Sequence, residues 1–224
     1  MEKSYEKLIE YVKGNILNHN LHIGDKLPSE RDLAEKLGIS RNSIREGMKI
    51  LERIGVVSSQ HGAGNYILGE FSHTLTEVLS MMYSLQELEM YQITEFRHGL
   101  EYGAMNLAVQ NATEEQKEKM LFHLQALDNA KTEKERVIHD KKIHYLLIES
   151  SQNKYMLINF IALTEIMDLY IPTMRGKILT SMKTGDLLYE AHRLIVEGVI
   201  QNDLDKGIKG LTLHFQYIND YQNP

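Results

Sequence analysis

Residues 28–68 read PSERDLAEKLGISRNSIREGMKILERIGVVSSQHGAGNYIL, and this stretch decides the fold of the first part of the chain. Ser29 can cap a helix that stops at Gly38, because a serine hydroxyl accepts from a first-turn N–H and glycine tolerates the left-handed conformation. After a short turn, Ser40 can cap a second helix that ends at Gly55. Two capped helices joined by a glycine-containing turn predict a helix-turn-helix.

Two short strands are predicted after these helices, at 56–60 and 65–68, and such a hairpin would form a wing. The second helix places basic side chains at every fourth position, so they make one stripe beside its apolar face. By itself this stripe could be a solvated face paired with Glu46 and Glu52, but its combination with two capped helices and a hairpin favours DNA. The candidate DNA-binding residues of this helix are Ser40, Arg41, Asn42, Ser43, Arg45 and Lys49.

The string LPSERDLAEKLGISRNSIREGMKILERIGVV at 27–57, followed by HGAGNYIL at 61–68, resembles the DNA-binding domain of the GntR family of bacterial transcription regulators. Ala63 stands at the wing tip where many relatives carry a basic residue, which predicts a weaker contact with the minor groove. By this resemblance the residues that contact DNA include Arg31, Arg41 and Arg45, with His61 and Gly62 of the wing reaching the minor groove.

The 224 residues have room for two domains, expected at 1–70 and 71–224. Residues 1–70 hold 10 Lys and Arg against 10 Asp and Glu, whereas the whole chain holds 25 against 31, so the net charge of −6 belongs to the second part. DNA responds to the local basic stripe rather than to this overall charge. The chain has no cysteine, which excludes disulfides and thiolate chemistry. Without a signal-peptide pattern or an apolar run of membrane-spanning length, we expect a cytoplasmic protein with no membrane partner.

Helical periodicity is the only pattern from residue 74 onward, so the expected fold class is mainly α, a winged helix-turn-helix followed by an all-helical bundle. Thr113 and Thr132 begin capping boxes, and Pro172 should kink or end a helix. The predicted helices are 4–19 in the first part and 74–83, 85–111, 113–130, 133–151, 154–180, 186–201 and 204–221 in the second.

The second part resembles the ligand-sensing FCD domain of the FadR subfamily. The motifs that carry this resemblance are EFRHGLE at 95–101, DKKIH at 140–144 with Asn153, EAH at 190–192, and LH at 213–214. The order and spacing of these motifs support the resemblance more than any single motif does. The resemblance covers nearly all of residues 74–224.

Four polar side chains of this part fall on apolar helix faces: Asp140 and His144, which are four residues apart, then His192 and His214. Any one of these histidines could be an ordinary core residue, whereas all four residues at positions that match the FCD pattern favour a divalent metal site. Zinc, nickel, iron and manganese suit this donor set, with zinc the default. Apart from these three histidines and His61 of the wing, the remaining six of the ten histidines show no such pattern and are expected to be ordinary.

Arg97 also lies on an apolar face, and a buried guanidinium needs an anionic partner. That partner is either Glu101 or another structural acid, or the carboxylate of a ligand. The FCD resemblance favours the ligand and makes Arg97 the candidate effector-binding residue, with Arg175 a less favoured second candidate. A metal ion and a guanidinium in one cavity would together select a small hydroxy, keto or dicarboxylic acid.

The leading hypothesis is a transcription regulator and not an enzyme, a repressor that binds a short palindromic operator as a homodimer and responds to a small carboxylate. The alternative is a metal-dependent hydrolase or lyase using the Asp/His₃ site. Four protein ligands leave little open coordination, however, and such an enzyme would not need residues 28–68. An architectural DNA binder without a sensor would leave Arg97 and the four candidate ligands unexplained.

Overall fold

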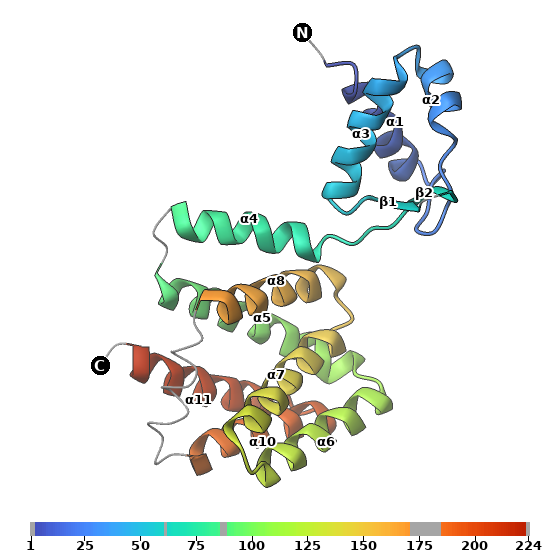
Figure 1. Ribbon diagram of the computed structural model, residues 1–224. Helices are drawn as coiled ribbons and strands as arrows, with labels where there is room; N and C mark the ends of the chain where they lie inside the picture. The colour runs from blue at the N-terminus through green and yellow to red at the C-terminus, as the bar shows by residue number, and fades with distance from the viewer. Residues whose placement is uncertain (1–2, 61, 86–88, 171–184, 223–224) are drawn as a thin grey trace. The chain divides into compact units, whose positions relative to one another are not determined.

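The structure is a computed structural model that describes residues 3–60, 62–85, 89–170 and 185–222 (Figure 1). The chain divides into two compact units, Met1–Glu77 and Val78–Pro224. The first unit contains, before residue 72, α1 (Glu6–Leu17), α2 (Glu30–Leu37), α3 (Arg41–Arg53), β1 (Val57–Gln60) and β2 (Gly64–Ile67).

The predicted helix caps of the first unit are confirmed. The Ser29 hydroxyl accepts from the backbone N–H of Asp32 at 3.2 Å, and the Ser40 hydroxyl accepts from that of Ser43 at 3.1 Å. Gly38 ends α2 in the left-handed conformation with φ +63°. α2 and α3 therefore form the helix-turn-helix that the sequence predicts.

The wing and the core complete this unit. β1 pairs antiparallel with β2, with Val57 opposite Ile67, close to the predicted strand positions. α1 contributes Leu8 and Val12 to a core that also contains Ile44 of α3. The N-terminal amphipathic helix thus supports the helix-turn-helix, and Val57 and Ile67 of the small sheet belong to the same core.

From residue 72 onward the described residues form helices and the short connections between them, in agreement with the predicted fold class. Its helices are α4 (Ser72–Leu85), α5 (Met90–Asn111), α6 (Glu114–Asn129), α7 (Glu133–Ser150), α8 (Lys154–Tyr170), α10 (Gly185–Ile200) and α11 (Leu204–Gln222).

Both predicted capping boxes are present: Gln116 and Glu135 accept from the backbone N–H groups of Thr113 and Thr132 at 3.0 and 3.1 Å. α5 begins five residues later than predicted. Pro172 and Arg175 lie outside the described residues.

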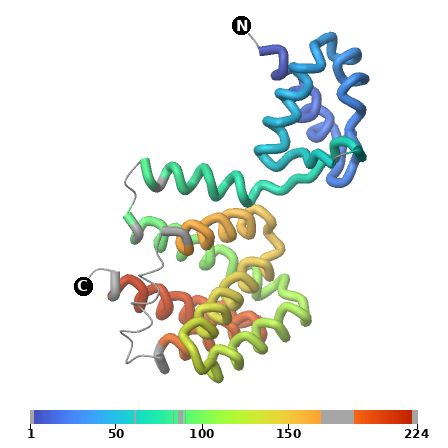
Figure 2. Tube along the Cα trace, in the orientation of Figure 1, coloured from blue at the N-terminus to red at the C-terminus, as the bar shows by residue number. Residues whose placement is uncertain are grey.

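The helical unit packs around a core to which α5, α6, α7, α10 and α11 all contribute. α10 and α11 lie side by side, joined by the short connection 201–203 (Figure 2). A Cβ atom on Gly198 would lie only 2.5 Å from the Cα of Gly207, and one on Gly210 would lie 2.6 Å from the backbone nitrogen of Ile195. These glycines let the two backbones touch, which sets the spacing of the two helices.

Across the residues that the structure describes, no helix is both long enough and apolar enough to cross a membrane.

Gly198→Ala should lower the free energy of unfolding of the helical unit by about 1–3 kcal/mol, because the added methyl group must push α10 away from α11. Chemical denaturation followed by circular dichroism measures this. The matched control is Gly99→Ala in α5, where an added Cβ meets nothing within 4 Å and the higher helix propensity of alanine, worth about 1 kcal/mol, should leave stability equal or raised. Equal midpoints for Gly198→Ala and the parent would contradict the assigned contact.

Candidate DNA-binding surface and metal centre

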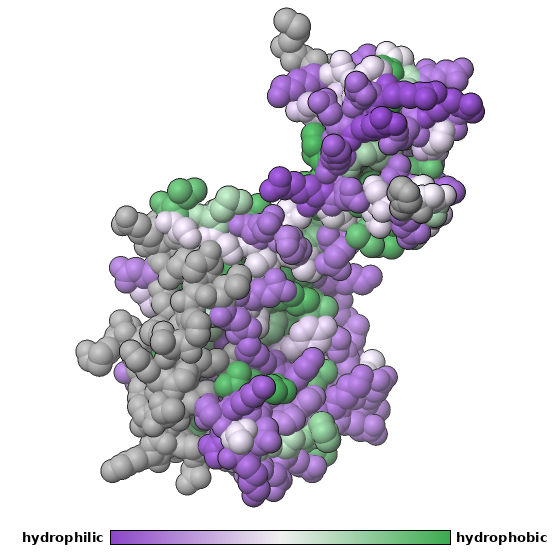
Figure 3. Space-filling view, viewed as in Figure 1, coloured by the Kyte–Doolittle hydropathy of each residue, from purple (hydrophilic) through white to green (hydrophobic). Residues whose placement is uncertain are grey.

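The exposed side of α3 carries the basic stripe expected from the sequence. Arg41, Arg45 and Lys49 are exposed, whereas Ile44 and Met48, which alternate with them, are buried in the core. Figure 3 shows hydrophilic side chains over much of the visible face of this unit. The helix therefore presents one side to its own core and a basic side to solvent, as a recognition helix requires.

Two of the candidate arginines have acidic neighbours. Arg45 Nε donates to Glu30 Oε2 at 2.8 Å, and Arg31 Nε lies 3.5 Å from Asp32 Oδ1. In the wing, Gly62 has φ +76°, and His61 lies outside the described residues. The remaining candidates, Ser40, Asn42 and Ser43, lie in or next to the first turn of α3.

The second candidate site is a buried cluster inside the helical unit. Asp140 and His144 come from α7, His192 from α10 and His214 from α11, with exposed fractions of 7, 0, 0 and 3%. The inward orientation predicted for all four side chains is confirmed. One ligand atom from each lies within 4.8 Å of all the others.

The individual distances in this cluster suit a shared ion. His192 Nε2 lies 2.9 Å from Asp140 Oδ1, and His144 Nε2 lies 3.1 Å from His214 Nε2. Asp140 Oδ1 is 3.8 and 3.9 Å from the Nε2 atoms of His144 and His214. Two ligand atoms that bind one ion at about 2.0–2.1 Å are roughly 3–3.4 Å apart, so small shifts would bring all four atoms into one coordination shell.

His192 has one ring nitrogen, Nδ1, outside the cluster and the other, Nε2, inside it. The hydrogen bond made by Nδ1 determines whether Nε2 carries a hydrogen or a lone pair. His192 Nδ1 lies 2.8 Å from the carbonyl oxygen of Leu188, and a carbonyl oxygen can only accept, so Nδ1 carries the hydrogen. In the neutral ring, Nε2 then directs a lone pair at Asp140 Oδ1, which is itself an acceptor. Two acceptor atoms at 2.9 Å attract each other only through a hydrogen or a cation that both can contact, and a metal ion bound to both would be such a cation.

Arg97 is buried as predicted, with 6% of its surface exposed, and its partner in the described structure is Glu101. Arg97 Nε donates to Glu101 Oε1 at 2.6 Å, and the guanidinium lies over the rings of Phe160 and Phe215. Within the described residues, no hydrogen bond uses the two terminal nitrogens of Arg97. The other oxygen of Glu101 lies 2.5 Å from His144 Nδ1, so Glu101 joins Arg97 to the histidine cluster.

Burial governs the protonation of these groups. It lowers the pKa of His144 to about 4, even though the Glu101 carboxylate acts in the opposite direction. Burial and the neighbouring imidazoles hold the pKa of His214 well below its ordinary value. For Glu101, burial alone would raise the pKa, but the charge of Arg97 and the His144 contact hold it well below the ordinary range. Near neutral pH the His144 and His214 rings are therefore uncharged, and a neutral imidazole is the form that binds metals.

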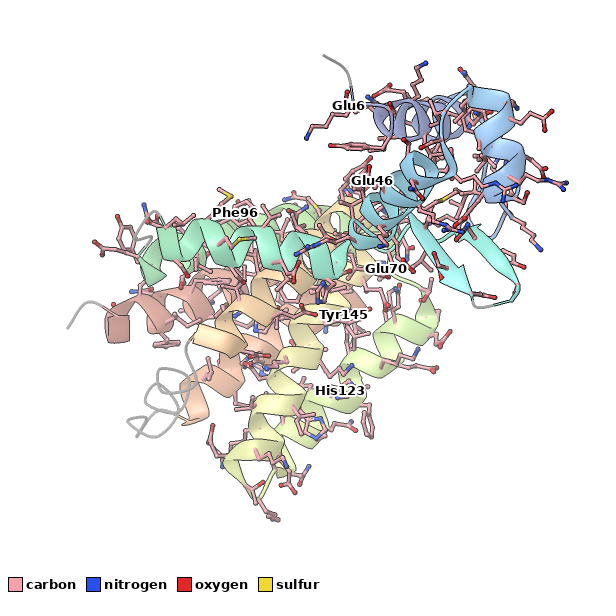
Figure 4. All side chains as sticks on the ribbon, turned by 45° about the horizontal axis from the view of Figure 1, so that its top comes forward. Glu6, Glu46, Glu70, Phe96, His123 and Tyr145 are labelled. Atoms are coloured by element: carbon pink, nitrogen blue, oxygen red, sulfur yellow. The ribbon has the colours of Figure 1, made fainter. Side chains whose placement is uncertain are left out.

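Two contacts were missed by sequence reasoning. Glu101 was considered only as a partner of Arg97, and nothing in the sequence indicates its contact with His144, 43 residues away. His123, labelled in Figure 4, was expected to be ordinary, yet its Nδ1 lies 3.0 Å from Nδ1 of His139. This second contact could have been found, because the two positions are equally far from the connection between α6 and α7.

A winged helix-turn-helix followed by an all-helical unit with a buried polar cluster defines a transcription regulator with a separate sensing unit. Residues 4–67 match the family described as bacterial regulatory proteins, gntR family, and residues 92–217 match the FCD domain. The chain belongs to the GntR family and carries an FCD domain. Proteins of this architecture bind operator DNA with the first unit and small-molecule effectors with the second.

Similar proteins span nearly the whole chain. The HTH-type transcriptional regulator LutR of Bacillus subtilis is 29% identical over 212 residues, which cover 92% of this chain and 94% of LutR. An Escherichia coli K12 protein with the provisional name L-lactate dehydrogenase operon regulatory protein is 25% identical over 220 residues, 96% of this chain and 84% of that protein. The structure of Streptococcus agalactiae GntR has the same fold, with a TM-score of 0.64 at 20% identity over 98% of both chains.

The family assignment decides between the two functions that the sequence left open. The chain is a regulator rather than a metal-dependent enzyme, because both matched domains and the relatives belong to transcription regulation.

Proposed function

We propose that this chain is a metal-containing repressor that acts in the cytoplasm as a homodimer. It occupies a short palindromic operator and releases it when a small carboxylate enters the FCD domain. Arg31 and the first turn of α3 contact the operator, and the wing reaches the minor groove. The proposed DNA-binding residues are Arg31, Ser40, Arg41, Asn42, Ser43, Arg45, Lys49, His61 and Gly62, the proposed metal ligands are Asp140, His144, His192 and His214, and the proposed effector contact is Arg97.

The approach of His192 Nε2 to Asp140 Oδ1 is the observation that carries the metal proposal. A proton on His192 would explain this one contact, and a hydrogen on Nε2 of His214 would explain its 3.1 Å distance from Nε2 of His144, so two separate hydrogens would be needed. A single divalent cation receives all three nitrogens and the carboxylate oxygen. The donor set of imidazole and carboxylate suits zinc by default, or nickel, iron or manganese.

The electrostatics of the same region support a carboxylate effector. The terminal nitrogens of Arg97 form a fork that matches a carboxylate, and a divalent ion attracts carboxylate, hydroxyl and keto oxygens. A small hydroxy, keto or dicarboxylic acid satisfies both centres, whereas a neutral sugar or an amine satisfies neither. The provisional name of the Escherichia coli relative, which refers to an L-lactate dehydrogenase operon, agrees with this class of molecule.

Arg45→Ala should weaken operator binding by roughly 1–3 kcal/mol and relax the base preference at one position of each half-site, because one bidentate base contact is lost. Binding is measured by fluorescence anisotropy on operators selected from a random DNA pool and on single-base variants of them. The comparison variant is Lys49→Ala, which should weaken binding to all sequences alike through a lost phosphate contact. If Arg45→Ala binds every DNA as the parent does, the recognition-helix assignment is wrong.

His192→Ala or His214→Ala should abolish the increase in melting temperature that Zn²⁺ gives to metal-stripped protein, because an ion that binds only the folded state stabilises it by mass action. Metal content after dialysis should fall in parallel, and a chelator should produce the same effect in the parent. His123→Ala removes a histidine of α6 outside the cluster and should retain the full metal response. A melting curve of the parent that does not change on complete metal removal would count against the ion.

A small hydroxy, keto or dicarboxylic acid should raise the melting temperature of the metal-loaded parent and lower its operator affinity, through reciprocal coupling of the two sites. Both effects should shrink after metal removal and in Arg97→Ala. Arg97→Ala also leaves Glu101 without its counter-ion, which changes stability by itself. The readout is therefore the change in melting temperature and operator affinity that the acid causes in each variant. Arg193→Ala, on the surface of α10, is the control. A screen in which such acids change nothing while a neutral or cationic metabolite acts would defeat this proposal.

A further inference from the structure

Glu101 is completely buried, and its two carboxylate oxygens have different partners. Oε1 accepts from Arg97 Nε at 2.6 Å, and Oε2 lies 2.5 Å from His144 Nδ1. An ion pair alone would be satisfied by Arg97, whose guanidinium could take both oxygens in a fork. Here only one oxygen is bonded to Arg97, and the other is directed at a histidine of the candidate metal centre.

The second contact determines the orientation of His144. An ionised carboxylate can only accept, so His144 Nδ1 must carry the hydrogen. In the neutral ring, Nε2 then carries no hydrogen and has a free lone pair. This atom faces the cluster, 3.1 Å from His214 Nε2. Because the ring is fully buried, it cannot exchange this partner for water.

We propose that Glu101 is a positioning residue of the metal centre. It holds His144 in the Nδ1-protonated tautomer and at the angle that places Nε2 on the ion, while Arg97 holds the carboxylate in position. A carboxylate hydrogen-bonded to a metal-bound imidazole also increases the basicity of that ligand. This role rests on the proposed function, in which the cluster holds a cation.

The test must separate the orienting contact from the loss of a buried charge. Glu101→Gln alone leaves the Arg97 charge buried without an anion, which is destabilising in itself. The double variant R97M/E101M removes both charges and replaces them with flexible apolar side chains, so the net charge near the cluster is unchanged. The matched control is E190M/R193M, which removes the half-exposed Glu190–Arg193 ion pair of α10 and, with it, the contact of Arg193 with Glu197.

Two measurements follow on the full chain. The dissociation constant of Zn²⁺, obtained by competition with a chelating dye at constant pH, should rise about 10–100-fold in R97M/E101M and stay unchanged in E190M/R193M. In metal-free protein, ¹⁵N NMR should show His144 protonated on Nδ1 in the parent and in the control, and no longer exclusively so in R97M/E101M. A purely structural role of the Arg97–Glu101 pair would lower the melting temperature of metal-free protein without changing either readout.

Zinc affinity that is unchanged in a folded R97M/E101M would overturn the proposed role of Glu101. If this variant does not fold, R97L/E101L, which also removes both charges and leaves no acceptor for His144, provides the comparison, with weaker zinc binding expected and unchanged binding again decisive against the proposal. Absence of zinc binding by the parent would instead refute the metal centre itself. In that case the tautomer of His144 in R97M/E101M still shows whether Glu101 orients the ring.

Discussion

The interior of the helical unit is constrained by the burial of several polar side chains in one place. Three histidines and one aspartate converge in its interior, and a buried carboxylate or imidazole without partners costs several kcal/mol. The surroundings offset this cost in stages. Burial keeps His144 and His214 uncharged, a backbone carbonyl receives the outer N–H of His192, and the ion pair of Glu101 with Arg97 keeps a second carboxylate charged. What remains inside the cluster is a group of acceptor atoms close enough together to share one cation.

The two units use charge in opposite ways. On α3 the basic side chains remain in solvent, where they cost nothing to ionise and can attract a polyanion over the range of the Debye length. In the FCD domain Arg97, Glu101 and Asp140 are enclosed, where each charge matters more because water does not screen it. One chain with a net charge of −6 can therefore contain both an exposed basic stripe and an enclosed cluster of charged and polar groups.

Local patterns in the sequence predicted most of the fold, because helix caps act over three or four residues. Ser29, Ser40, Thr113 and Thr132 mark helix starts in the structure as they do in the sequence. The inward faces of the cluster residues followed from helical periodicity. The contact between Glu101 and His144 could not be predicted in this way, because it depends on how α5 and α7 are rotated against each other, and periodicity contains no such information.

The close contact of α10 with α11 has a mechanical consequence. Backbone atoms that touch at Gly198, Gly207 and Gly210 leave no layer of side chains that could yield, so the two helices resist sliding or rotating past each other. His192 and His214 therefore behave as two points on one rigid body. The other two cluster residues, Asp140 and His144, both come from α7, so a rearrangement of the cluster would displace α7 relative to this pair of helices. α7 is thus the part of the unit through which a change at the buried cluster can travel outward.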